Sequence, residues 1–109
     1  MTTFDDREKS YEKKFALDQE LMFKAHARRD KLFGIWAAGR LGLSDAAAEA
    51  YAKGIVSEDI IHPGDKAIAQ KVAGDLSAKG VKVAESELSA KLDELFATAK
   101  QQIATEAGK

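Results

Sequence analysis

Residues 14–38, KFALDQELMFKAHARRDKLFGIWAA, contain no proline and no turn-forming dipeptide. Apolar and charged residues are interleaved throughout this stretch in the manner of an amphipathic helix. The pattern extends back to Thr3, which is a suitable N-cap because acidic residues follow it in the first turn. It weakens at Gly34 and Gly39. We therefore predict one long helix over about residues 4–38.

The composition of the whole chain is typical of an all-α protein. It contains 109 residues, of which 45% are apolar and 32% are charged, with one proline and no cysteine. This length suits one domain, or one domain with an arm. The absence of cysteine excludes disulfides, a thiolate nucleophile and a cysteine-based zinc site, and it fits a reducing compartment. No run of about 18 apolar residues exists to span a membrane.

The charge balance argues against nucleic acid as a partner. The net charge is −1, whereas binding to phosphates favours an excess of basic residues. Both signs of charge alternate in the first residues, which is unlike a secretion signal. Together with the absence of cysteine and of a long apolar run, this predicts a cytoplasmic protein that does not span a membrane.

Three further helices are expected after the first. Their predicted spans are residues 45–53, 66–79 and 86–106. Ser44 caps the first of these, an alanine-rich helix that Gly54 ends. The turn at residues 62–65 precedes the next helix, with Asp65 as its N-cap. We predict an all-α four-helix bundle formed by residues 19–109.

Apolar stripes on these helices predict the core. The two stripes in the last two helices are Ile68, Val72 and Leu76, and then Leu88, Leu92, Leu95, Phe96, Ala99 and Ile103. Trp36 and its neighbours Leu32, Phe33 and Ile35 are expected where the first helix meets the bundle. The connection before the turn is expected to pack on the core through Ile55, Val56, Ile60 and Ile61.

Three aromatic residues near the start of the chain have no partner in this bundle. Phe4, Tyr11 and Phe15 are separated by seven and four residues, the spacing of one helical face. A helix over residues 4–38 would be about 50 Å long, whereas a domain of this size has a radius of gyration of about 13 Å. We therefore predict that residues 1–18 form a mobile arm, disordered when free, that becomes helical in a groove of a partner. The alternative is that the rings fold back on the bundle.

The two histidines do not define a metal site. His26 lies about one helical turn from Arg29 and Asp30, where it is placed to join a pH-sensitive ion pair. We favour a partly exposed packing histidine at this position and a solvent-exposed loop histidine at His62. Two histidines on separate elements, without cysteine, make a poor metal site. No metal and no cofactor are therefore expected.

Two charged stretches also favour ordinary structural roles. Arg28, Arg29 and Lys31 are interrupted by Asp30, and we interpret them as a solvated face. Residues 62–66, HPGDK, offer backbone amides at a helix start as a generic anion site. They lack the glycine-rich loop and the Gly-Lys-Ser/Thr ending of a phosphate-binding loop, so we favour a turn. No catalytic constellation stands out, and the chain is not expected to be an enzyme.

The sequence resembles the ζ subunit family of α-proteobacterial F-type ATP synthases, which inhibits ATP hydrolysis. The resemblance lies in TTFDDREK at residues 2–9, in the stretch of residues 14–38 quoted above, and in the helical layout that follows. It covers essentially the whole chain. It implies a small helical bundle whose mobile N-terminal segment enters a catalytic interface between the α and β subunits, near the rotating γ subunit, and becomes helical there.

The resemblance also implies which residues contact the catalytic head. They are Phe4, Asp5, Asp6, Arg7, Glu8, Lys9, Tyr11, Lys14 and Phe15. The rings would be buried in the interface, and the charges would pair across its rim. The protein would then lie at the cytoplasmic face of the inner membrane through ATP synthase, with weak nucleotide binding as a secondary property. The alternative function is a nucleotide- or small-molecule-sensing helical bundle, which would bind its ligand without the arm.

Overall fold

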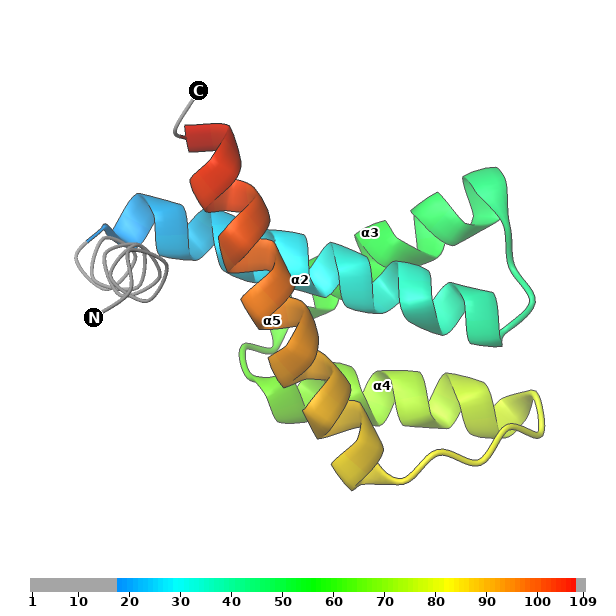
Figure 1. Cartoon of the computed structure of the whole chain (residues 1–109). Coiled ribbons are helices and arrows are strands. Elements are labelled where there is room, and N and C mark those ends of the chain that lie inside the picture. The colour runs from blue at the N-terminus through cyan, green and yellow to red at the C-terminus, as the bar shows by residue number, and fades with distance from the viewer. Residues whose placement is uncertain (1–17, 108–109) are drawn as a thin grey trace, which may run out of the picture.

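The computed structural model describes residues 18–107, which form four α-helices and, within that range, no strand. The helices are α2 (Gln19–Arg40), α3 (Asp45–Ile61), α4 (Asp65–Ala78) and α5 (Glu85–Ala107). In Figure 1, α3 packs along α2, and α5 crosses both α4 and α2, so that the end of α5 lies near the start of α2. The predicted all-α four-helix fold is confirmed. The predicted contact residues of the arm lie outside the described residues.

The helix α2 starts at its own cap. Asp18 has an extended backbone (φ −111°, ψ 98°), and its carboxylate accepts hydrogen bonds from the backbone amides of Glu20 and Leu21 at 3.1 and 3.2 Å. A capped end with an extended residue interrupts a helix, so the prediction of one helix over residues 4–38 is wrong at Asp18. The predicted start at Thr3 lies outside the described residues.

The helix α3 is longer than predicted. Gly54 was expected to end it but lies within it, and α3 continues to Ile61. A glycine inside a helix costs only about 1 kcal/mol relative to alanine, which the surrounding contacts of α3 outweigh. Pro63 sets the end of the helix, because the residue before a proline is driven away from the helical conformation. That residue, His62, has φ −124° and ψ 81°.

The longer helix changes where its isoleucines point. Ile55 is fully buried, as predicted for this segment, and Val56 is half-buried. Ile60 and Ile61 are 69% and 66% exposed, so the expectation that they pack on the core is wrong. The physical reason is that the segment is helical rather than a loop folded inward, and only one face of a helix reaches the core.

The other two helices agree with their predicted spans to within a residue or two. One detail differs at the start of α4, where the N-cap is Gly64 and not Asp65. Gly64 has φ 123°, a conformation that favours glycine. Asp65 is the first residue of α4, which leaves its carboxylate available for the ion pair described below.

Most of the buried apolar side chains form one cluster, called here the main core. Its members are Phe33, Ala37, Ile55, Ile68, Ala69, Val72, Leu76, Leu88 and Leu92. All four described helices contribute, and both predicted stripes supply residues to it. Trp36 was expected in the core but is only partly buried: its ring stacks on Phe33, with 5.8 Å between centroids, at the edge of the cluster. Among the described residues, no helix is long and apolar enough to cross a membrane.

A second, smaller cluster lies where α5 ends beside the start of α2. Its buried members are Leu21, Ala25, Ile103 and Ala104, and Met22 and Phe96 pack against them. We call this cluster the arm-bearing end, because the predicted arm directly precedes the start of α2 in the sequence. Only two helices form it, and two of its four buried residues are alanines.

Candidate functional site

The arm-bearing end is fastened on its surface by one arginine. Arg28 on α2 donates from Nη1 to Gln102 Oε1 at 2.9 Å, and its two terminal nitrogens donate to both carboxylate oxygens of Glu106 at 2.8 and 2.9 Å. The bidentate hydrogen bond to Glu106 raises the pKa of Arg28. This pairing joins the last turns of α5 to α2, and therefore fixes the end of the domain at which α2 begins.

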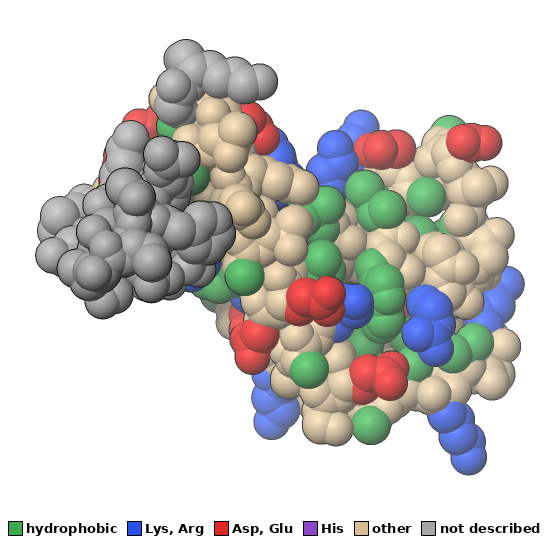
Figure 2. All heavy atoms as spheres, viewed as in Figure 1, with side chains coloured by type: hydrophobic (Ala, Val, Ile, Leu, Met, Phe, Trp, Pro, Cys, Tyr) green, Lys and Arg blue, Asp and Glu red, His purple; other side chains and the backbone are tan. Residues whose placement is uncertain are grey.

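A mixed aromatic and basic surface lies further along α2. Figure 2 shows hydrophobic side chains on this face of the molecule, with both basic and acidic side chains around them. Trp36 on α2 contacts two cations: the guanidinium of Arg40 and the ammonium of Lys91 lie 5.6 and 5.5 Å from its ring centroid. Cations over an indole are stabilised by its π face. These contacts hold the edge of the main core.

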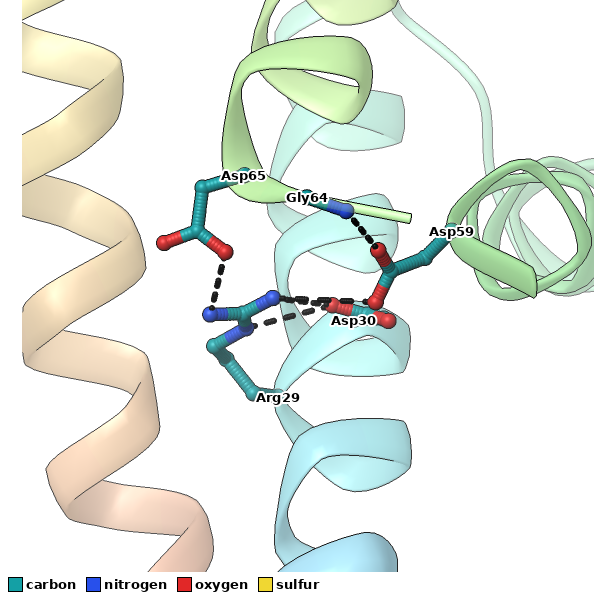
Figure 3. Close-up of polar contacts among 5 residues, drawn as sticks. All are labelled: Arg29, Asp30, Asp59, Gly64 and Asp65. Atoms are coloured by element: carbon teal, nitrogen blue, oxygen red, sulfur yellow. Dashed lines mark hydrogen bonds and ion pairs between the residues drawn. The ribbon is translucent and has the colours of Figure 1, made fainter. Parts of the chain in front are cut away.

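The expected solvated basic face is wrong for its central residues. Arg29 and Asp30 are 3% and 2% exposed, and Figure 3 shows them between α2 and the corner that joins α3 to α4. Arg29 donates from Nε and Nη2 to Asp30 Oδ1 at 3.1 and 2.9 Å. The sequence showed neighbouring charges of opposite sign, which usually lie in solvent. Burial was missed because the other partners come from distant segments.

Those partners are two further aspartates. Arg29 Nη1 pairs with Asp65 Oδ1 at 2.9 Å, and Nη2 lies 3.8 Å from Asp59 Oδ2. The backbone amide of Gly64 donates to Asp59 Oδ1 at 3.1 Å. The interpretation of residues 62–66 as a turn is thereby supported over an anion site, since a carboxylate of the chain itself already accepts from this amide.

The two neighbouring carboxyl groups have opposite pKa shifts. Burial, reinforced by the hydrogen bond with Asp59, raises the pKa of Asp30 to about 7, against the opposing effect of Arg29. Burial also acts to raise the pKa of Asp59, but the hydrogen bonds from Asp30 and Gly64 and the charge of Arg29 outweigh it, so that the pKa of Asp59 is lowered. These opposite shifts mean that Asp30, and not Asp59, is the carboxyl group of the two that takes up a proton as the pH falls through about 7.

Both histidines lie in the kind of position that the sequence predicted for them, on a helix surface and in a turn. The ring of His26 is 4.5 Å from that of Phe96, centroid to centroid, which confirms the packing interpretation. Burial, and next the positive charge of Arg29, lower the pKa of His26. His62 is exposed in the turn, as predicted. Within residues 18–107, no three potential ligands among His, Asp and Glu are grouped to hold a metal ion.

These features define a class: a small all-helical domain with one dominant core, an internal ion-pair network and a start marked by its own helix cap. The chain matches the family model of ATPase inhibitor subunit zeta over residues 1–102 and belongs to this family. A solved solution NMR structure is similar, with a TM-score of 0.69 and 43% sequence identity, covering 79% of this chain and 98% of that one. No curated protein matches the chain.

Membership confirms the resemblance found in the sequence and gives the chain an inhibitory, regulatory role on ATP synthase. The matched span includes the first residues as well as nearly all of the helical domain.

Proposed function

We propose that residues 1–17 are the inhibitory element and that they fold into a catalytic interface between the α and β subunits of the ATP synthase head, near the γ subunit. Such an interface opens and closes as ATP is hydrolysed. A segment that becomes ordered inside it acts as a wedge that prevents closure. The cost of ordering the segment is met on binding.

The observation that carries this proposal is the cap at Asp18. Because the Asp18 carboxylate satisfies the first free amides of α2, the helical domain has a start of its own and does not need a preceding helix. The cap supports the proposal that the arm is a separate functional part, and we take its boundary to lie between residues 17 and 18, one residue earlier than the predicted end of the arm at residue 18. The family match, which reaches back to residue 1, supports a shared role for this segment.

Within the arm, the aromatic and the charged side chains have different roles in binding. Phe4, Tyr11 and Phe15 are the apolar anchors, since buried aromatic residues are frequent hot spots of binding. The charged contacts set orientation and association rate more than affinity. They are Asp5, Asp6, Arg7, Glu8, Lys9 and Lys14. The helical domain adds contacts of its own, so that arm and domain bind as linked parts.

The direct test is ATP hydrolysis by the purified catalytic head, titrated with the full chain and with a protein comprising residues 18–109. We expect the shortened protein to lose at least about tenfold in inhibitory potency, with nearly the same melting temperature because Asp18 is retained. A protein that also lacks Asp18 serves as control: it loses the cap, worth about 1 kcal/mol, and must inhibit no better. Equal inhibition by residues 18–109 and by the full chain would contradict the proposal.

A further inference from the structure

The buried ion-pair network has more negative than positive groups. Three carboxyl groups, those of Asp30, Asp59 and Asp65, surround the single guanidinium of Arg29. The side chains of Arg29 and Asp30 are 4% and 3% exposed, and that of Asp59 is 19% exposed. Uncompensated charge is costly at such depth, because protein interiors solvate ions poorly.

The carboxyl groups of Asp30 and Asp59 are the pair that needs a proton. Figure 3 shows Asp59 reaching from α3 toward Asp30 on α2. Their carboxyl groups meet at the same nitrogen of Arg29, with Asp30 Oδ1 2.9 Å and Asp59 Oδ2 3.8 Å from Nη2. Two carboxylates this close in a buried site repel each other, and a proton on one of them removes the repulsion and supplies a donor to the other. Asp65 is different, since 57% of its side chain is exposed and it has a direct contact with Arg29 Nη1.

We propose that Asp30 and Asp59 form a pH-sensitive link between α2 and the α3–α4 corner, closed when one proton lies between their carboxyl groups and weakened when that proton leaves. The proton comes from solvent and returns to it, and no other group is required. When it leaves, two adjacent carboxylates repel each other and share one guanidinium. Asp59 also holds the amide of Gly64, so the strain is transmitted to the turn that starts α4.

Charged groups from every described helix surround this link. On α2 these are His26 and Arg29, Asp59 is on α3, Asp65 is on α4, and Lys100 on α5 acts on His26. The raised pKa of Asp30, about 7, agrees with the geometry, because burial and the nearby Asp59 outweigh Arg29.

The sign of the pH dependence follows from these directions. The pKa of Asp30 in the folded protein, about 7, exceeds the ordinary value of 3.8, so the folded state binds more protons between these two values. The contribution of Asp30 to the free energy of unfolding is therefore fully present below about pH 4. It is lost as the pH rises to about 7. The lowered pKa of Asp59 has the opposite effect on stability: its contribution is lost as the pH falls, and only below the ordinary value of 3.8. His26 also acts oppositely, just below its ordinary value of 6.5.

The test compares denaturation of the wild-type protein and Asp30→Asn between pH 5 and 8. Asparagine keeps the shape, can donate to Asp59 and cannot titrate. The difference between the two proteins removes the His26 contribution, which both share. We expect the ratio of their folding constants to change by about tenfold per pH unit from pH 5 to about 6.5 and to level off above 7. A ratio that is constant with pH would overturn the proposal.

A control variant and an independent NMR titration complete this test. Asp93→Asn removes an exposed carboxylate from α5 and must retain the wild-type pH dependence. In wild-type protein, ¹³C NMR of the aspartate carboxyl carbons should show one group titrating near pH 7, and this measurement decides the matter if Asp30→Asn does not fold. Titration of all aspartates below about pH 5, in the range of ordinary carboxyl groups, would overturn the proposal.

Discussion

The main core and the arm-bearing end are stabilised in different ways. The main core joins four helices through large, fully buried side chains such as Phe33, Leu76 and Leu92. The arm-bearing end joins only α2 and α5, with alanines among its buried residues and an ion pair on its surface between Arg28 and Glu106. Since hydrophobic stabilisation scales with buried apolar area, the difference indicates that the fold is determined mainly by the main core, away from the start of α2 where the proposed arm is attached. A segment attached at the weaker end can be used for binding without carrying the stability of the domain.

The largest expected effect is in the main core. Leu92 on α5 is 1% exposed, and Leu92→Ala should destabilise the domain by about 2–5 kcal/mol through lost burial and a cavity. Leu95→Ala, on the same helix but only half-buried, is the control and should cost less. Urea denaturation measures both. Equal losses for the two variants would mean that the main core is misplaced.

A smaller effect is expected where α2 and α3 cross. A Cβ atom on Gly34 would lie 2.6 Å from the backbone Cα of Ala52, whereas one on Gly54 would meet nothing within 4 Å. Gly34→Ala should therefore cost about 1–3 kcal/mol by overpacking. Gly54→Ala, inside α3, should instead stabilise by about 0.5–1 kcal/mol. Denaturation midpoints that move in the same direction for both variants would contradict the close helix crossing.

The smallest effect on global stability is expected at the arm-bearing end. Arg28→Ala removes a contact whose side chains are 30% and 53% exposed, so it should cost at most about 1 kcal/mol. Amide hydrogen exchange in the last turns of α5 should nevertheless become faster, while the main core stays protected. Lys24→Ala, which removes a pair within α2 alone, should leave α5 unchanged. Unchanged exchange in α5 of Arg28→Ala would show that the surface pair does not hold this end.

The helix count, the third and fourth spans and the main-core stripes followed from the sequence because they depend on local periodicity. The errors arose where the structure depends on contacts between residues that are far apart in the sequence. Gly54 was interpreted as a helix end, whereas the packing of Ile55 against the core keeps α3 helical beyond it. Pro63 was the stronger stop signal, because it acts on the backbone directly.

The buried ion-pair network likewise depends on residues that are far apart in the sequence, so local patterns did not predict it. Arg29 and Asp30 have the local sequence of a solvated charge run, and nothing near them in the chain indicates burial. Only the folding of α3 and α4 brings Asp59 and Asp65 beside them. One signal was present in the sequence: Asp59 and Asp65 flank the turn at residues 62–64, which is where acidic side chains can converge on a cation from another helix.

If a distinct arm inhibits and a separate domain supports it, mutation should separate inhibition from stability. The most direct measurement is a titration of ATP hydrolysis by the catalytic head with the variant Phe4→Ala/Tyr11→Ala, alongside its melting curve. Two lost aromatic anchors should weaken inhibition at least about tenfold and leave the melting temperature nearly unchanged. Lys9→Glu, the matched charge variant, should weaken inhibition less and in a salt-dependent manner. If the double variant inhibits as strongly as the wild-type protein, the arm is not the inhibitory element, and the helical domain itself must be the inhibitory surface.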